Sequence, residues 1–229
     1  MNRVLVFDVN ETLLDVAALD PFFARVFRDP AVRREWFGQM LQSAFVTTIT
    51  GNYRDFGTLA MGALGMVAER HGVALTDDDR QELGVGMRSL PPHPEVRSAL
   101  ERLRDAGFRL ATLTNSTSAV AEAQLTNAGL RDLFEEALSA DSVKRLKPAP
   151  EPYRMAAESL AVPVGQVRLV AAHAWDVAGA LSAGCVAAFV ARPGQVLDPG
   201  GTQPDITGAT LDDVAARIIA IDHRWGPGD

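Results

Sequence analysis

Near its start the chain reads Val4-Leu5-Val6-Phe7-Asp8-Val9-Asn10-Glu11-Thr12, an apolar run that turns polar at Asp8. Consecutive apolar residues are typical of a strand buried on both faces of a parallel sheet. Open α/β sheets build their sites just beyond the carboxyl ends of such strands. Asp8 stands at that point and is followed by a turn-forming Asn and a hydroxyl, so we expect it to be an exposed nucleophile rather than a core residue.

Strand-like runs alternate with helical patterns along the rest of the chain. This alternation predicts an α/β fold with a Rossmann-like parallel sheet core flanked by helices. We expect strands over 4–7, 108–113, 167–172 and 186–190, and helices over 95–106, 119–128 and from about 176 to 183. Thr210-Leu211-Asp212-Asp213 resembles a capping box and predicts the start of the last helix.

The strand pattern disappears between Asp15 and about Leu90, where apolar and aromatic residues recur at helical spacing. We expect residues 15–91 to form a helical cap subdomain inserted after the first strand, and residues 1–14 and 92–229 to form the α/β core domain. Most aromatic residues of this cap should pack in its interior, and a minority should line a substrate cavity.

Composition limits the classes of partner. With 229 residues and 47% hydrophobic content, the chain can bury a sizeable core without disulfides or a structural metal. Its net charge of -7 argues against nucleic-acid and anionic-membrane partners, which would call for a surplus of Lys and Arg. One cysteine, Cys185, lies in an apolar run and is expected to be buried. With no room for a signal peptide before the first strand, we expect a cytoplasmic protein.

Three further segments should meet Asp8 at the carboxyl edge of the sheet. Two of these segments are weak evidence when taken alone. Residues 114–116, Thr-Asn-Ser after a strand, are a common start of a helix, and a lysine before proline, as at 147–148, is usually a solvated charge. Near a nucleophilic aspartate in a dry cleft, however, an ammonium group favours the charged carboxylate. The segments are Leu113-Thr114-Asn115-Ser116, Lys147-Pro148-Ala149-Pro150-Glu151-Pro152-Tyr153 and Val170-Ala171-Ala172-His173-Ala174-Trp175-Asp176.

In order and approximate spacing, these motifs resemble those of the haloacid dehalogenase superfamily. The resemblance implies that Asp8 attacks the substrate and forms a covalent ester. The superfamily's phosphatases usually carry carboxylates where this chain has Asn10 and Ala172. A departing halide needs no proton, and a hard divalent cation needs several oxygen ligands. We therefore expect carbon–halogen cleavage without a metal or any other cofactor.

The segment around Trp175 and Asp176 resembles the type II branch, the L-2-haloacid dehalogenases. That branch usually has glycine at position 11 and an amide at position 173, where this chain has Glu11 and His173. A carboxylate can orient an imidazole, so we expect this pair to activate water. Alternatively, His173 only bonds to the loop backbone.

The resemblance also places a halide-binding cap arginine where this chain has Phe37. Arg33, Arg34 or Arg54 could take its place, or Asn115, Gln39 and aromatic edges could form the halide site.

The expected reaction converts a short 2-haloalkanoic acid into a 2-hydroxy acid. Asp8, Glu11, His173, Lys147 and Asp176 are the expected catalytic residues. Two alternatives stay open: hydrolysis of a small phosphate ester, and non-catalytic binding of a small anion. We expect a small anionic substrate and a homodimer. The residues expected at the substrate, or orienting the groups around it, are Asn10, Thr12, Thr114, Asn115, Tyr153, Trp36, Phe37 and Gln39.

Overall fold

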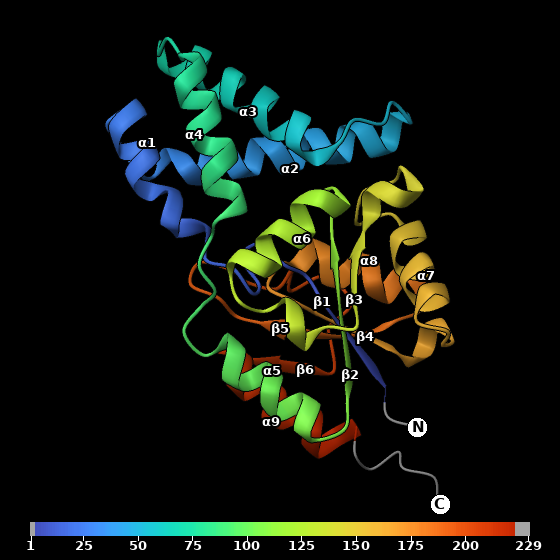
Figure 1. Cartoon of the computed structure of the whole chain (residues 1–229). Coiled ribbons are helices and arrows are strands. Elements are labelled where there is room, and N and C mark those ends of the chain that lie inside the picture. Colours follow the sequence, from blue (N-terminus) through green and yellow to red (C-terminus); the bar gives the residue numbers. More distant parts are fainter. Residues whose placement is uncertain (1–2, 223–229) are drawn as a thin grey trace, which may run out of the picture.

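A computed structural model describes residues 3–222 of the chain. Its core is a six-stranded, wholly parallel sheet in the order β3-β2-β1-β4-β5-β6 (Figure 1). The predicted parallel α/β sheet is confirmed, and the first strand lies at its centre. The strands are β1 (Val4–Phe7), β2 (Arg109–Thr114), β3 (Glu136–Ser139), β4 (Val167–Ala171), β5 (Val186–Val190) and β6 (Ile206–Gly208).

Helices cover both faces of the sheet, because successive side chains of a strand point to opposite sides. Leu5 and Phe7 belong to one buried cluster, which includes residues of α5 and α9. Val4 and Val6 belong to a second cluster, which includes residues of α7 and α8. The core helices are α5 (Val96–Asp105), α6 (Ser118–Asn127), α7 (Pro150–Ser159), α8 (Ala174–Ala183) and α9 (Leu211–Asp222), with short 3-10 turns η2 (Arg131–Leu133), η3 (Ala140–Val143) and η4 (Val164–Gln166).

The starts of helices α8 and α9 can be compared with the starts expected from the sequence. The expected capping box of α9 is confirmed, since Thr210 and Asp213 exchange hydrogen bonds between side chain and backbone. Helix α8 begins two residues earlier than expected, because the N–H groups of Asp176 and Val177 both donate to the carbonyl of His173. His173 therefore sits immediately before the helix, at the carboxyl end of β4.

Four longer helices follow β1 and lie over the carboxyl edge of the sheet (Figure 1). The outgoing and returning chains run side by side, since Asp15 N–H donates to the Pro91 carbonyl and His93 N–H to the Leu13 carbonyl. These cap elements are η1 (Val16–Leu19), α1 (Asp20–Phe27), α2 (Val32–Thr50), α3 (Phe56–His71) and α4 (Asp77–Arg88).

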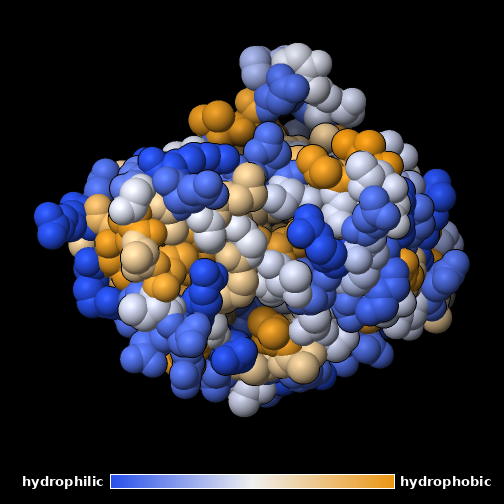
Figure 2. All heavy atoms as spheres, turned by 90° about the horizontal axis from the view of Figure 1, so that it is seen from above, coloured by the Kyte–Doolittle hydropathy of each residue, from blue (hydrophilic) through white to orange (hydrophobic). Residues whose placement is uncertain are grey.

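Seen from the cap side, the surface is mostly polar, with apolar side chains in separate groups (Figure 2). Val46, Ile49 and Met66, all on cap helices, are among the exposed large apolar residues. Within residues 3–222, no helix combines the length and apolar character that crossing a lipid bilayer requires.

Candidate active site

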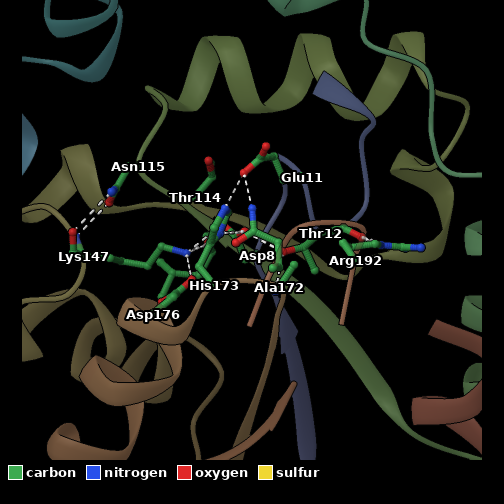
Figure 3. A network of polar contacts seen from close by, with 12 residues as sticks. Asp8, Glu11, Thr12, Thr114, Asn115, Lys147, Ala172, His173, Asp176 and Arg192 are labelled. Carbon is green, nitrogen blue, oxygen red and sulfur yellow. Dashed lines mark hydrogen bonds and ion pairs between the residues drawn. The ribbon is translucent and has the colours of Figure 1, made fainter. Parts of the chain in front are cut away.

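Asp8 and Lys147 form a buried ion pair at the carboxyl edge of the sheet (Figure 3). The ammonium donates to Asp8 Oδ1 at 2.9 Å, to Asp176 Oδ2 at 2.6 Å and to the Leu113 carbonyl at 2.8 Å. An ammonium has three N–H donors, so all of them are used. Lys147 therefore has no N–H left for a substrate carboxylate and is committed to Asp8 and Asp176.

This arrangement keeps Asp8 ionised. Burial by itself would raise the pKa of Asp8, but Lys147 and His173 outweigh it and hold that pKa well below its ordinary value. Burial also opposes the charge of Lys147, yet Asp176 and Asp8 raise the pKa of its ammonium. Burial and the charge of Asp8 together raise the pKa of Asp176. A charged carboxylate is thus available for attack at neutral pH, as a nucleophile requires.

Two hydroxyl groups orient this ion-paired cluster. Thr12 donates to Asp8 Oδ2 at 2.7 Å and accepts from the Ala172 N–H at 3.0 Å. Tyr153 donates to Asp176 Oδ1 at 2.6 Å. Both side chains are buried and neither lines the cavity beside Asp8. Thr12 and Tyr153 are thus positioning residues, and direct substrate contact is not supported.

His173 lies between two carboxylates. Its Nε2 is 2.7 Å from Glu11 Oε2, and its Nδ1 is 3.4 Å from Asp8 Oδ2, which is longer than an ordinary hydrogen bond. Burial disfavours the imidazolium, but Asp8 and Glu11 together raise the pKa of His173 to about 9. The histidine is therefore positively charged at neutral pH, and it bonds to Glu11 rather than only to the loop backbone.

Glu11 occupies a backbone conformation that favours glycine. Its φ angle of 61° lies in the left-handed region, which costs a residue with a Cβ about 1 kcal/mol or more. The glycine usual at this position in type II enzymes would fit without that cost. Such strain persists where surrounding contacts hold it, and it is common at functional sites.

The loop after β5 supplies contacts that the sequence did not suggest. Gln195 Nε2 donates to Glu11 Oε2 at 3.0 Å. Arg192 donates twice to the Thr12 carbonyl, at 3.2 and 2.9 Å, and once to Glu95. This loop carries no recognisable motif, and only its position beside the β1 loop reveals its role.

A small pocket opens beside Asp8, and we call it the reaction pocket. Phe37 lies in it, as expected, but the neighbouring Trp36 does not. Trp36 is fully buried and donates to the Ala60 carbonyl inside the cap at 2.9 Å, because one helical step turns a side chain by about 100°. Sequence reasoning missed Leu41, Phe56 and Trp175 as lining residues. The reaction pocket is lined by Asp8, Asn10, Phe37, Leu41, Phe56, Thr114, Asn115, His173 and Trp175.

The polar cap residues also lie elsewhere than expected. Gln39 hydrogen-bonds with Gln42 and Arg70 and does not line the reaction pocket. Arg33 donates to Asp20 at 2.5 Å, and its Nη1 is 3.7 Å from Glu11 Oε1. Of the arginines considered for the halide, Arg54 lines neither the reaction pocket nor the larger cavity that adjoins it. Arg33 and Arg34 line that larger cavity, which shares Phe37, His173 and Trp175 with the reaction pocket.

The two asparagines are already engaged by the protein. Asn115 donates to the Lys147 carbonyl at 3.3 Å and accepts from the Lys147 N–H at 2.8 Å, so it fixes the lysine loop. Asn10 accepts from Gln124 at 2.9 Å. Thr114 accepts from the Ser116 N–H at 3.2 Å, and its hydroxyl proton stays available to a ligand in the pocket.

The side chains at this site do not suit a divalent cation. Position 172 is Ala, the Asn10 oxygen is engaged, and the Lys147 ammonium occupies the space between Asp8 and Asp176. A hard cation needs several oxygen ligands, and a fixed ammonium repels it. Among residues 3–222, no group of three or more His, Cys, Asp or Glu side chains is placed to hold a metal ion.

A parallel sheet with an ion-paired aspartate at the end of β1 defines an α/β protein with a carboxylate-nucleophile site. The sequence profile of the haloacid dehalogenase-like hydrolases matches residues 3–184. The chain belongs to this family of hydrolases.

Among individual proteins, the chain is similar to several dehalogenases. The chain is 30% identical over 214 residues to (S)-2-haloacid dehalogenase 2 of Pseudomonas sp. (strain CBS-3), covering 93% of each chain. It is 27% identical over 221 residues to haloacetate dehalogenase H-2 of Moraxella sp. (strain B), covering 96% of this chain and 98% of the relative. Its fold matches L-2-haloacid dehalogenase from Xanthobacter autotrophicus with chloropropionic acid covalently bound, with a TM-score of 0.90, 24% identity and coverage of 96% of this chain and 100% of the other.

Proposed function

We propose that this protein is a hydrolytic dehalogenase that converts short 2-haloalkanoic acids into 2-hydroxy acids through an ester on Asp8. The observation that carries the proposal is the ionised Asp8 held by the fully used Lys147 ammonium beside a pocket lined by Phe37, Leu41, Phe56 and Trp175. The names of the relatives, (S)-2-haloacid and haloacetate dehalogenases, support this substrate class.

In the first displacement, a carboxylate oxygen of Asp8 attacks the carbon that bears the halogen. A new C–O bond forms, the C–X bond breaks, and its electron pair leaves with the halide. Lys147 and Thr12 hold the carboxylate in a fixed orientation, which lowers the entropic cost of reaching the attack geometry. The substrate carboxylate binds the Thr114 hydroxyl and the backbone at this sheet edge.

In the second step, water attacks the ester carbonyl of Asp8 and regenerates its carboxylate. The esterified Asp8 carries no charge, so His173 keeps only Glu11 as an anionic neighbour and its pKa falls from about 9. His173 can then lose its proton and act as a general base. The Glu11 side chain is 18% exposed, so the proton has a route to solvent.

The four helices of residues 15–91 act as a cap in this mechanism. Phe37, Leu41 and Phe56 from the cap close the reaction pocket over groups supplied by the core. Excluding water protects the first displacement and strengthens the electrostatic contacts of Asp8.

Isotope labelling tests the covalent step. With enzyme in excess over substrate in water labelled with heavy oxygen, the first product should carry unlabelled oxygen and the label should appear in Asp8. The variant His173→Ala should release one halide per enzyme and accumulate an adduct on the Asp8 peptide. Label passing directly into the first product would refute the ester mechanism.

The two alternatives receive less support. Phosphate ester hydrolysis in this superfamily uses carboxylates at positions that are Asn10 and Ala172 here. Magnesium-dependent release of phosphate from a small ester would favour it. Stabilisation by haloacids without any halide release would favour a non-catalytic anion binder.

The cytoplasmic location and the homodimer remain predictions. The single buried Cys185 is consistent with a reducing compartment. Sedimentation at several protein concentrations would determine the oligomeric state.

A further inference from the structure

The departing halide needs a positive or hydrogen-bonding partner, and this chain has Phe37 where the resemblance drawn from the sequence implies a cap arginine. Lys147 has no free N–H, because its three donors go to Asp8, Asp176 and the Leu113 carbonyl. Arg33 lines the cavity that adjoins the reaction pocket, but its guanidinium is paired with Asp20 at 2.5 Å and lies 3.7 Å from Glu11. Unpaired N–H groups among the side chains that line the reaction pocket itself are therefore candidates for that partner.

Two buried N–H groups at this pocket have no hydrogen-bond partner within the protein. They are Nε1 of Trp175 and Nδ1 of His173, and the latter lies 3.4 Å from Asp8 Oδ2, an ion-pair contact outside hydrogen-bond geometry. Buried polar groups are nearly always satisfied, and exceptions often mark a ligand position. Both side chains line the reaction pocket, and both come from the start of α8, where the helix dipole favours an anion. His173 is itself only 4% exposed.

The aromatic surroundings of His173 suit a cation. Its ring is stacked with Phe37 at a centroid distance of 6.0 Å and an interplanar angle of 19°. It is also stacked with Trp175, at 5.2 Å and 24°. Aromatic faces attract a cation, and Glu11 at 2.7 Å supplies the balancing charge. Phe37, a cap residue, thus contacts the positively charged His173 of the core.

We propose that His173 Nδ1–H and Trp175 Nε1–H together receive the departing halide, so that the cationic role of the cap arginine passes to the core. This proposal rests on the dehalogenase function proposed above. During the displacement, negative charge moves from Asp8 to the halide, and both positions lie beside His173. The imidazolium keeps an anionic neighbour throughout, and no proton is transferred in this step.

Departure of the halide then changes the role of His173. Once Asp8 is an ester and the halide has left, Glu11 is the remaining anion in contact with the imidazole. The imidazolium loses its proton to solvent and becomes the base for the water that attacks the ester. Halide held in the pocket should delay this change and slow ester hydrolysis.

The test measures the rate of halide release in a single turnover of 2-chloropropionate and 2-bromopropionate. Trp175→Phe keeps the ring and removes the N–H, and it should slow release at least about tenfold, since one lost donor to a developing anion costs that much or more. His173→Asn should slow it as well, while the Asp8 adduct still forms. Trp36→Phe is the matched control, because that indole lies inside the cap, and its release rate should stay at the wild-type value.

A rescue experiment provides the second criterion. Phe37→Arg added to His173→Asn should restore much of the release rate, because it returns the cation to the cap. Added bromide should slow ester hydrolysis in the wild type more than in Trp175→Phe. Wild-type release rates in Trp175→Phe and His173→Asn, with the adduct still formed, would overturn the halide assignment and leave the dehalogenase function intact. Absence of both halide release and adduct in the wild type would refute the function itself.

Discussion

Replacing Lys147 by Met tests the central ion-paired cluster. The Lys147 ammonium is fully buried and contacts two carboxylates, Asp8 at 2.9 Å and Asp176 at 2.6 Å. Methionine has a similar length and keeps much of the packing, but it removes the charge and all three donors. The variant therefore leaves two buried carboxylates without the lysine, and only Asp8 keeps a cationic neighbour, His173.

The expected loss of stability is large. Removing one partner of a buried ion pair costs about 3–5 kcal/mol, because the other charge stays buried and uncompensated. At about 2–4 °C per kcal/mol for a chain of this size, the melting temperature should fall by roughly 10 °C. Two carboxylates share the lysine, so the upper part of the energy range is expected at pH 7.

The loss should also depend on pH in a defined direction. Lys147 lowers the pKa values of both Asp8 and Asp176, so both should rise relative to the wild type when it is removed, although His173 still opposes the rise at Asp8. A raised carboxyl pKa favours the folded state when the group is protonated, so the difference from wild type should shrink as pH falls.

Urea unfolding at pH 7.0 and 5.0 measures both effects. Lys144→Met is the matched control. That lysine is 60% exposed, and its ammonium pairs with Asp141 and lies over the Tyr53 ring, so its loss should cost less than about 1 kcal/mol. A loss below about 1 kcal/mol for Lys147→Met, or a loss that grows as pH falls, would refute the electrostatic account of the site.

Three other predictions follow from the surrounding contacts. Glu11→Gln removes one of the two carboxylates around His173, so the imidazole pKa should fall from about 9 toward 6.5, and nuclear magnetic resonance titration of the ring measures it. Because its pKa is raised in the folded state, charged His173 should contribute its full stabilisation below about pH 6.5 and lose it as pH rises through about 9. Unfolding free energies measured across this pH range test it, and the same pH dependence in Glu11→Gln as in the wild type would contradict it. Arg192→Leu removes the only cation paired with Glu95 among the described residues, and it removes the arginine that donates to the Thr12 carbonyl. It should lower the free energy of unfolding by about 3 kcal/mol and slow halide release; unchanged unfolding would show that the loop after β5 does not hold the β1 loop. Prolonged treatment with a chelator should leave halide release unchanged, and recovery by added magnesium after a loss would reveal a metal requirement.

The parallel sheet was predictable because its pattern is local. Val4–Phe7 is apolar at every position, as a central strand buried on both faces requires, and the polar residue that follows marks the edge of the sheet. The convergence of Asp8, Lys147 and Asp176 was also predictable, since parallel strands bring their carboxyl ends to one edge. The sequence predicted helix boundaries only to within one or two residues, as at the start of α8, because terminal hydrogen bonds depend on neighbouring loops.

The sequence by itself therefore determined the fold class, the placement of Asp8 and Lys147 at one edge of the sheet, and the departures at positions 10, 11, 37, 172 and 173. Tertiary structure alone decided that Phe37 faces the pocket while Trp36 faces the cap interior, because a single helical step reverses the environment of a side chain. It also decided that Gln195 holds Glu11 and that Phe37 stacks on His173. These contacts join residues far apart in the chain, and no local periodicity encodes which of them will meet.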